Sequence, residues 1–363
     1  MKFHLHGLAA AALLVTSGAA SAVTFNFTFV AGTSAQAQAA FNAAAARWSS
    51  VLTDNVTLDM TVGTAALGAG ILASTGSRSV DFSYSNFYTA LGNDRTSAND
   101  NTAFGSLGGG SSVSMLINRT SDNPNGSGSA TPYIDSAGAN NSTMHITTAN
   151  AKALGLATGS GTVGSCVTTC DASIVFSNTF AFDFDPTNGI TAGQYDFVGI
   201  ATHEIGHALG FISGVDVLDI NSPPVNGPFL ANQFTFLNSL DLFRYSALSK
   251  ASGVIDFTAD TRAKYFSIDG GTTIGPGFST GRNFGDGQQA SHWKDSLGLG
   301  IMDPTAATGE LLAISANDLT AFDVIGWNLA NVTAPIPEPS TYALFALGLA
   351  GLAARRYKNT KPQ

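Results

Sequence analysis

The residues of this chain with the clearest chemistry are His203, Glu204 and His207, in the sequence His-Glu-Ile-Gly-His. On a helix, residues four apart lie on one face, so the two imidazoles can bind one metal ion together. The carboxylate between them is placed to act as a general base toward a water beside that metal. The chain has only 6 His and three Glu, so this pattern arises by chance in roughly one such chain in a thousand. We therefore predict a hydrolytic zinc site here, rather than a buried helix whose polar side chains are only structural.

A catalytic zinc site usually takes three protein ligands and leaves one position for water, so a further ligand is required. In the compact metzincin pattern the third ligand lies six residues after the second His. Here that position holds Ser213, which is no zinc ligand. Two aspartates shortly after it, Asp216 and Asp219, are one pair of candidates. The other candidate is His292, in the sequence Ser-His-Trp.

The supply of histidines favours His292 as the third ligand. Beyond the first 22 residues only His145 remains besides these three, and its surroundings are typical of a strand or loop histidine. A glutamate ligand just after the helix is excluded, because the next Glu along the chain is Glu310. Ten residues after His292 comes Met302, in Gly-Ile-Met-Asp-Pro, a tight turn that can place a polarizable thioether beneath a metal site.

The elements that must position these residues can be read from hydrophobic periodicity. Alternation predicts strands at residues 23–30, 56–62 and 172–184, and helical spacing predicts a helix over 34–52 that begins at Ser34. The helix of the two histidines should run from about Asp196, a suitable N-cap, to about Phe211. Residues 93–141 are rich in Gly, Ser and Asn and are expected to form loops and hairpins, followed by a short helix at 148–154.

Three further groups of residues have simple structural interpretations. Asp241 and Arg244, three apart on a predicted helix, are expected to form an ion pair. Tyr245 beside them is a candidate donor to an oxyanion, although a structural role is the stronger prediction. Ser315 and Asp318 have the spacing of a capping box and predict the start of a last amphipathic helix.

The two ends of the chain have the composition of targeting signals. Residues 1–22 combine Lys2, an apolar stretch and Ala-Ser-Ala, as in a secretory signal peptide, so the mature chain should begin near Val23. Near the other end, Pro-Glu-Pro-Ser at 337–340 precedes uncharged residues 341–354 and then Arg355 and Arg356. Fourteen residues fall short of the roughly 20 that a spanning helix prefers, so a plain anchor helix is the weaker alternative.

Composition agrees with export and excludes some partners. Only 11 % of residues are charged, against about 25 % in average proteins, and the net charge is −9. An acidic chain does not favour nucleic acid or anionic lipid as a partner. Cys166 and Cys170 are the only cysteines, and an oxidising periplasm favours a disulfide between them over a redox or metal-binding role.

Two resemblances follow from these motifs. The tail at residues 335–363 resembles the PEP-CTERM sorting signal of Gram-negative bacteria, which implies transient anchoring at the inner membrane and cleavage by a sorting enzyme of the exosortase type. The helix motif, the long insertion at 214–290, Ser-His-Trp and the methionine turn resemble the leishmanolysin-like branch of the metzincin proteases. The closer likeness is to exported bacterial metalloproteases with PEP-CTERM tails.

The metzincin resemblance implies a fold and a mechanism. The fold would be α+β and zincin-like over residues 23–334, with a twisted mixed sheet and the active-site helix in an upper lobe, and the methionine turn and C-terminal helix in a lower lobe. Zn²⁺ would be bound by His203, His207 and His292, with Glu204 as the general base of an endopeptidase acting outside the inner membrane. The strand at 172–184 would pair with extended substrate.

Two alternatives compete with the protease. One is a non-catalytic surface or biofilm-matrix protein that binds zinc for stability, which Glu204 argues against because a structural site needs no general base. The other is zinc-dependent hydrolysis of a non-peptide amide or ester, which the motif does not exclude.

Overall fold

The computed structural model describes residues 22–222 and 229–330. The predicted sorting segment lies outside these residues, as does the predicted signal peptide except for Ala22. The described residues as far as Leu329 belong to one unit, which has a mixed α+β architecture with several small sheets. Among the described residues, no helix has the length and apolar character that a membrane crossing requires.

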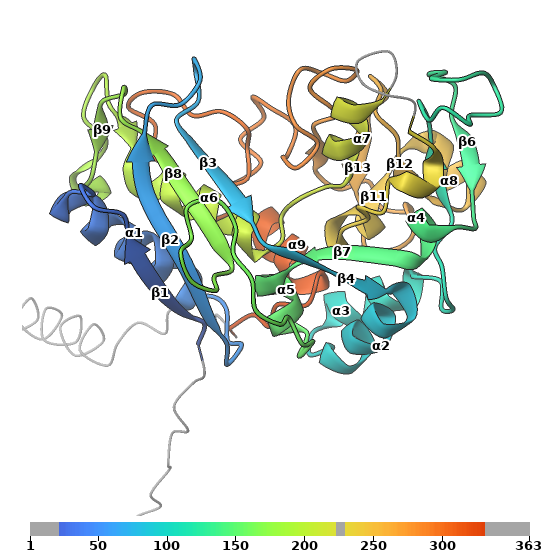
Figure 1. Cartoon of the computed structure of the whole chain (residues 1–363), viewed down its shortest axis with the longest axis horizontal. Helices are drawn as coiled ribbons and strands as arrows, with labels where there is room; N and C mark the ends of the chain where they lie inside the picture. The colour runs from blue at the N-terminus through green and yellow to red at the C-terminus, as the bar shows by residue number, and fades with distance from the viewer. Residues whose placement is uncertain (1–21, 223–228, 331–363) are drawn as a thin grey trace, which may run out of the picture. The chain divides into compact units, whose positions relative to one another are not determined.

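The largest sheet has four strands in the order β1-β2-β8-β3, with bounds Thr24–Phe29, Thr57–Ala65, Ala172–Ser177 and Ala73–Ser77. β1, β2 and β8 run parallel to one another, whereas β3 pairs antiparallel with β8. β3 therefore lies at the edge of the sheet (Figure 1). One side of such an edge strand offers unpaired backbone groups to an added strand.

Two helices pack against this sheet, α1 (Ala35–Ser49) and α6 (Phe197–Leu209), and they also contact each other (Figure 1). The fully buried ring of Phe41 on α1 contacts Phe27 of β1, Phe176 of β8 and Phe197 of α6. The predicted first strand, first helix and second strand are confirmed, and Ser34 caps α1 as expected by accepting from a backbone N–H.

The remaining elements form the rest of the unit. The helices are α2 (Tyr84–Asp94), α3 (Ala98–Ser106), α4 (Ala139–Ser142), α5 (Thr148–Ala153), α7 (Val215–Asn221), α8 (Ala247–Ser252) and α9 (Ala316–Val324), with 3₁₀ turns η1 (Pro186–Asn188), η2 (Ala231–Gln233) and η3 (Ser239–Phe243). The strands are β4 (Ser79–Ser83), β5 (Met115–Ile117), β6 (Tyr133–Asp135), β7 (Thr143–Thr147), β9 (Phe182–Asp183), β10 (Tyr195–Asp196), β11 (Arg244–Tyr245), β12 (Ile255–Phe257), β13 (Lys264–Phe266) and β14 (Gly277–Phe278). These strands form four small sheets, with the strand orders β4-β7, β10-β9, β12-β5-β6 and β11-β13-β14.

Two local predictions need correction. The segment 93–141, expected to be loops and hairpins, also contains the helices α3 and α4. α3 begins at a capping box in which Ser97 and Asp100 bond each other's backbone N–H, a signal that the Gly- and Ser-rich composition obscured. The predicted strand at 172–184 is interrupted after Ser177, so β8 and β9 belong to different sheets.

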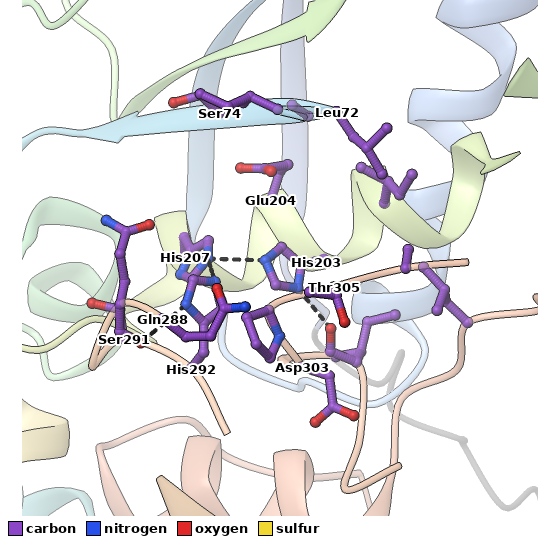
Figure 2. Close-up of a pocket in the computed structure, with 18 of the residues that line it drawn as sticks. Leu72, Ser74, His203, Glu204, His207, Gln288, Ser291, His292, Asp303 and Thr305 are labelled. Atoms are coloured by element: carbon purple, nitrogen blue, oxygen red, sulfur yellow. Dashed lines mark hydrogen bonds between the residues drawn. The ribbon is translucent and has the colours of Figure 1, made fainter. Parts of the chain in front are cut away.

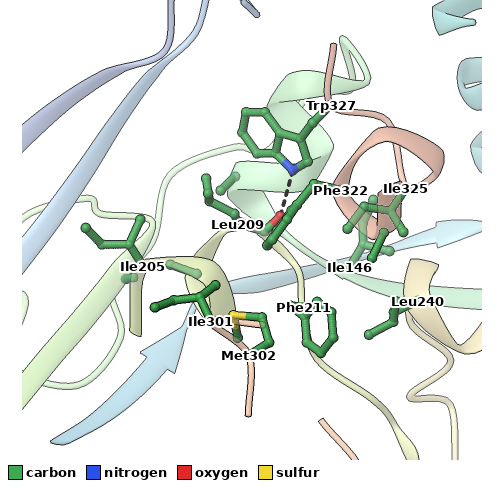
Figure 3. Close-up of a cluster of buried hydrophobic side chains, with 14 of the residues drawn as sticks. Ile146, Ile205, Leu209, Phe211, Leu240, Ile301, Met302, Phe322, Ile325 and Trp327 are labelled. Atoms are coloured by element: carbon green, nitrogen blue, oxygen red, sulfur yellow. Dashed lines mark hydrogen bonds between the residues drawn. The ribbon is translucent and has the colours of Figure 1, made fainter. Parts of the chain in front are cut away.

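Buried apolar side chains pack around α6. Figure 3 shows Ile205 and Leu209 of α6 near Met302, Phe211 and Phe322. The indole N–H of Trp327 donates to the carbonyl oxygen of Leu209 at 2.9 Å, so the end of α6 is fixed to the segment that follows α9 (Figure 3). The predicted last helix is confirmed as α9, and its Phe322 ring packs against Trp48 of α1 and against Phe211, which follows α6.

Candidate metal centre

α6 begins and ends at residues suited to those positions. Asp196 is its N-cap and accepts from the backbone N–H of Gly199 at 2.8 Å. Gly210 ends the helix with φ +118°, a left-handed conformation that glycine adopts without steric cost. The chain then reverses, so that the carbonyl of Phe211 faces back toward the helix. The predicted helix is confirmed, with ends one or two residues inside the expected ones.

His203, His207 and His292 point toward one another from two parts of the chain (Figure 2). Nε2 of His207 lies 3.0 Å from Nε2 of His203 and 3.1 Å from Nε2 of His292. Among the described residues, this is the group of His, Cys, Asp and Glu side chains close enough together to hold a metal ion. Spacing alone brings the first two together, whereas the third comes from a segment between β14 and α9.

The other ring nitrogen of each histidine faces a backbone carbonyl oxygen. Nδ1 of His203 lies 2.7 Å from the oxygen of Ile301, and Nδ1 of His207 lies 2.8 Å from that of Phe211. Nδ1 of His292 lies 3.3 Å from the oxygen of Gln289. Because a carbonyl only accepts, each Nδ1 carries the proton and each Nε2 presents a lone pair to the other two.

These three side chains fit a zinc ion. Lone pairs that converge at about 3 Å repel one another unless a cation lies between them, and tetrahedral Zn–N bonds of about 2.0–2.1 Å place ligand nitrogens about 3.3 Å apart. Burial lowers the pKa of His207 to about 3, and it lowers the pKa of His292 well below its usual value. Both rings are therefore neutral near pH 7, the form that binds metal.

Glu204 extends from α6 toward β3, on the cleft side of the histidines (Figure 2). Its Oε2 accepts a hydrogen bond from the hydroxyl of Thr75 on β3 at 2.6 Å. Burial raises the pKa of the Glu204 carboxyl, and the nearby His203 and the Thr75 hydroxyl oppose that rise. Sequence reasoning missed Thr75, because nothing local marks a threonine on an edge strand as the partner of a residue 129 positions away.

Met302 lies beneath α6 and is fully buried. A Cβ added at Gly206, between the two histidines of the helix, would lie 2.4 Å from the Met302 sulfur. The glycine of the His-Glu-Ile-Gly-His sequence therefore leaves the space that the methionine fills (Figure 3). The Met302 sulfur thus packs against α6 at Gly206, between the positions of His203 and His207.

Asp318 on α9 holds the methionine turn from the other side. Its carboxylate accepts from the backbone N–H of Ile301 at 2.8 Å, from that of Met302 at 3.3 Å and from the indole N–H of Trp293 at 2.8 Å. The same carboxylate completes the predicted capping box with Ser315. This one residue thus fixes the carbonyl that orients His203 and the residue that follows His292.

The alternative ligands considered from the sequence lie elsewhere. His145 is on β7, where its Nδ1 lies 2.6 Å from a carboxylate oxygen of Asp81. Asp216 accepts from the backbone N–H groups of Ala290 and Ser291, and Asp219 accepts from those of Asn283 and Phe284. None of these three side chains joins the histidine group.

The predicted ion pair of Asp241 and Arg244 is wrong. Asp241 lies in the 3₁₀ turn η3 and accepts instead from the hydroxyl of Ser213 and from two backbone N–H groups. Among the described residues, Arg244 pairs with no carboxylate at salt-bridge distance.

Tyr245 lies on β11 and is buried away from the residues that line the histidine cleft. Cys166 and Cys170 are joined in a disulfide.

The histidines and Glu204 lie in a cleft of about 950 Å³. β3 forms one bank with Ala73, Ser74 and Thr75, and the segments around Gln288 and residues 300–315 form the other. The expectation that the strand at 172–184 pairs with substrate is wrong, because β8 already has β2 on one side and β3 on the other. The strand edge that borders the cleft is β3.

Comparison with known proteins gives one match. Residues 335–356 match the family model of the PEP-CTERM protein-sorting motif. This motif marks proteins that Gram-negative bacteria export across the membrane and sort to the cell surface or the extracellular space. The protein is exported. Its sorting motif implies processing by an exosortase-type enzyme. No curated protein and no solved structure matches the chain.

Proposed function

We propose that this exported protein is a zinc-dependent endopeptidase with a zincin-like fold. The observation that carries the proposal is the convergence of three Nε2 lone pairs beside the Glu204 carboxylate, inside a cleft bordered by an edge strand. A structural zinc site would fill its fourth position with a protein ligand and would need neither a cleft nor an adjacent base. Among the described residues, the histidine group offers three ligands and no fourth.

His203, His207 and His292 would hold the zinc ion through Nε2. Zinc bound there supplies a Lewis acid that polarises a carbonyl group and lowers the pKa of a water molecule to about 7. The backbone carbonyls of Ile301 and Phe211 keep His203 and His207 in the tautomer that leaves Nε2 free, and they orient the rings.

Glu204 would move the proton. Its carboxylate takes a proton from the attacking water and later delivers it to the amine that leaves. Burial raises the pKa of this carboxyl in the metal-free protein, and a raised pKa makes the carboxylate a stronger base. The Thr75 hydroxyl holds Oε2 and leaves the other oxygen, Oε1, for the proton transfer.

The edge of β3 would bind the substrate backbone. An extended peptide can add to an edge strand through main-chain hydrogen bonds, which accept many side-chain sequences. Ala73, Ser74 and Thr75 lie on the cleft, and Thr75 also holds Glu204. Substrate binding and the general base are therefore linked through one strand, and the peptide bond to be cut lies against the histidine group.

The test is cleavage of a mixed peptide library by the full-length protein loaded with zinc, beside Glu204→Gln and His145→Ala. Glu204→Gln keeps the size of the side chain and removes the base, so cleavage should fall by about 100- to 10,000-fold while bound zinc stays the same. His145→Ala should cut as well as the wild type, because His145 lies outside the histidine group.

Absence of cleavage by the wild-type protein, together with tight zinc binding, would refute the peptidase. That result would favour the non-catalytic surface or matrix protein, or a hydrolase of non-peptide substrates. Equal cleavage by the wild type and Glu204→Gln would refute the role of Glu204.

A further inference from the structure

The residues directly before His292 are held by the carboxylate of Asp216, which is partly buried. Oδ1 of Asp216, at the start of α7, accepts from the backbone N–H of Ala290 at 2.6 Å. Oδ2 accepts from the backbone N–H of Ser291 at 3.1 Å and also from its hydroxyl. Three donors on two consecutive residues fix both the position and the direction of the backbone that leads into His292.

A hydroxyl bridge connects this segment to the end of the histidine helix. The backbone N–H of Ser213, three residues after α6 and its glycine cap, donates to Oγ of Ser291 at 2.9 Å. The Ser213 hydroxyl donates in turn to Asp241 at 2.5 Å, and the backbone N–H of Gly214 donates to the same carboxylate at 2.9 Å. The turn after α6 and the segment before His292 therefore share one hydrogen-bond network.

The backbone after His292 is held from its other side. Ser279 donates its N–H to the carbonyl oxygen of His292 at 3.0 Å and its hydroxyl to that of Trp293 at 2.8 Å. Arg244, which is fully buried, donates to the carbonyl oxygen of Ser279 at 2.9 Å. Burial raises the pKa of Asp216 and of Asp241 to about 6, and hydrogen bonds together with the nearby charge of Arg244 oppose that rise.

His292 needs this support more than the other two histidines do. Its Nδ1 lies 3.3 Å from its carbonyl partner, whereas the corresponding distances for His203 and His207 are 2.7 Å and 2.8 Å. It also lies on no helix or strand, and its nearest β pairing is the isolated bridge between Phe278 and Trp293. A ligand held in place before the metal arrives binds more tightly, because the cost of ordering it has been met in folding.

We propose that Asp216 is a positioning residue for the third ligand, and that it sets the metal affinity of the centre by fixing the backbone of Ala290 and Ser291. The proposal rests on the proposed zinc centre but not on peptidase activity. It gives the insertion at 214–290 a function, since Asp216, Asp241, Arg244 and Ser279 all belong to it.

α7 offers a matched control in Asp219. This residue lies one helical turn after Asp216 and is 1 % exposed. Its carboxylate also accepts from backbone N–H groups of two consecutive residues, Asn283 at 2.7 Å and Phe284 at 2.9 Å. It therefore resembles Asp216 in bonding, is more deeply buried than Asp216, and holds a segment that carries no histidine.

The experiment compares Asp216→Asn and Asp219→Asn in the full-length protein. Zinc affinity is measured by competition with a chelator, and the stability of the metal-free proteins is measured by urea unfolding. Asp216→Asn should weaken zinc binding by about 10- to 100-fold, the range found when a supporting partner of a metal ligand is removed. Asp219→Asn should lose similar stability yet bind zinc within about threefold of the wild type.

Equal zinc affinities in the two variants would overturn the proposal while leaving the zinc centre standing. Failure of the wild type to bind zinc would overturn both. Should Asp216→Asn fail to fold, Ser291→Ala removes only the bridging hydroxyl, and its affinity should fall by about three- to tenfold. An unchanged affinity in Ser291→Ala would then be the contradicting result.

Discussion

The two parts of the molecule that supply the histidines are built in different ways. His203 and His207 stand four apart on α6, whose regular backbone alone brings their rings together. His292 lies 85 residues after His207, in an irregular segment that carboxylates and hydroxyls hold in place. The positions of His203 and His207 thus follow from secondary structure. The position of His292 depends on hydrogen bonds between residues far apart in the sequence.

The largest loss of zinc affinity should come from removing a histidine ligand. The loss should be the same for a histidine of α6 and for His292. His207→Ala and His292→Ala should each weaken zinc binding on the order of 1000-fold, because each removes one of three bonds to the metal. His145→Ala is the control and should change nothing. Chelator competition measures all three affinities. A His292→Ala protein that binds zinc like the wild type would show that His292 is not a ligand.

Asp318 supports both parts of the centre, because it bonds Trp293 beside His292 and Ile301, whose carbonyl faces His203. Asp318→Asn removes a fully buried carboxylate and leaves part of the Trp293, Ile301 and Met302 donors without an acceptor. We expect a loss of about 3 kcal/mol in the free energy of unfolding. Ser315→Ala removes the helix cap and the hydroxyl hydrogen bond to the carbonyl oxygen of Leu299, and it should cost about 1 kcal/mol. Urea unfolding of both variants decides the matter, and equal losses would contradict the account.

Thr75 supports Glu204, which lies on the same helix as His203 and His207. Thr75→Val keeps the shape of the side chain and removes the hydrogen bond to Oε2 of Glu204. The rate of peptide cleavage should fall by about tenfold, since one charge-assisted hydrogen bond is lost, while zinc affinity stays unchanged. Ser77→Ala on the same strand is the control, because Ser77 bonds the His207 carbonyl rather than Glu204. A Thr75→Val enzyme as fast as this control would show that β3 does not orient the base.

The smallest effect is expected far from both halves. Burial, together with the charge of Asp54, raises the pKa of Asp94 to about 7. The folded state therefore keeps a proton that the unfolded chain releases from about pH 4, so this group's contribution to stability falls as the pH rises from 4 to 7. Asp94→Asn should raise the melting temperature by a few degrees at pH 8, roughly what 1 kcal/mol gives, and leave it unchanged near pH 3. A gain that is the same at both pH values would disagree with this assignment.

Local patterns predicted the helix half of the centre well. The spacing of His203 and His207, the cap at Asp196 and the glycine after the helix are all readable within a few residues. The third ligand required a different argument, the small number of histidines together with a family resemblance. The structure places His292 beside the other two, but no local pattern marks that position.

The supporting residues could not be predicted from the sequence. Asp216 contacts residues 74 and 75 positions away, and Thr75 contacts one 129 positions away, so neither leaves a periodic signal. The ion pair expected for Asp241 and Arg244 failed for the same reason, because tertiary donors were better placed than the neighbour on the chain. The order of the sheet, which makes β3 the edge, likewise depends on pairing between distant strands.

The central claim is that three imidazoles from these two regions bind one metal ion. X-ray absorption spectroscopy of the zinc-loaded protein measures the ligands directly. The account predicts one zinc per chain with three imidazole nitrogens at about 2.0–2.1 Å, and two in His292→Ala. A wild-type spectrum with fewer than three imidazoles, or one that His292→Ala leaves unchanged, would contradict it.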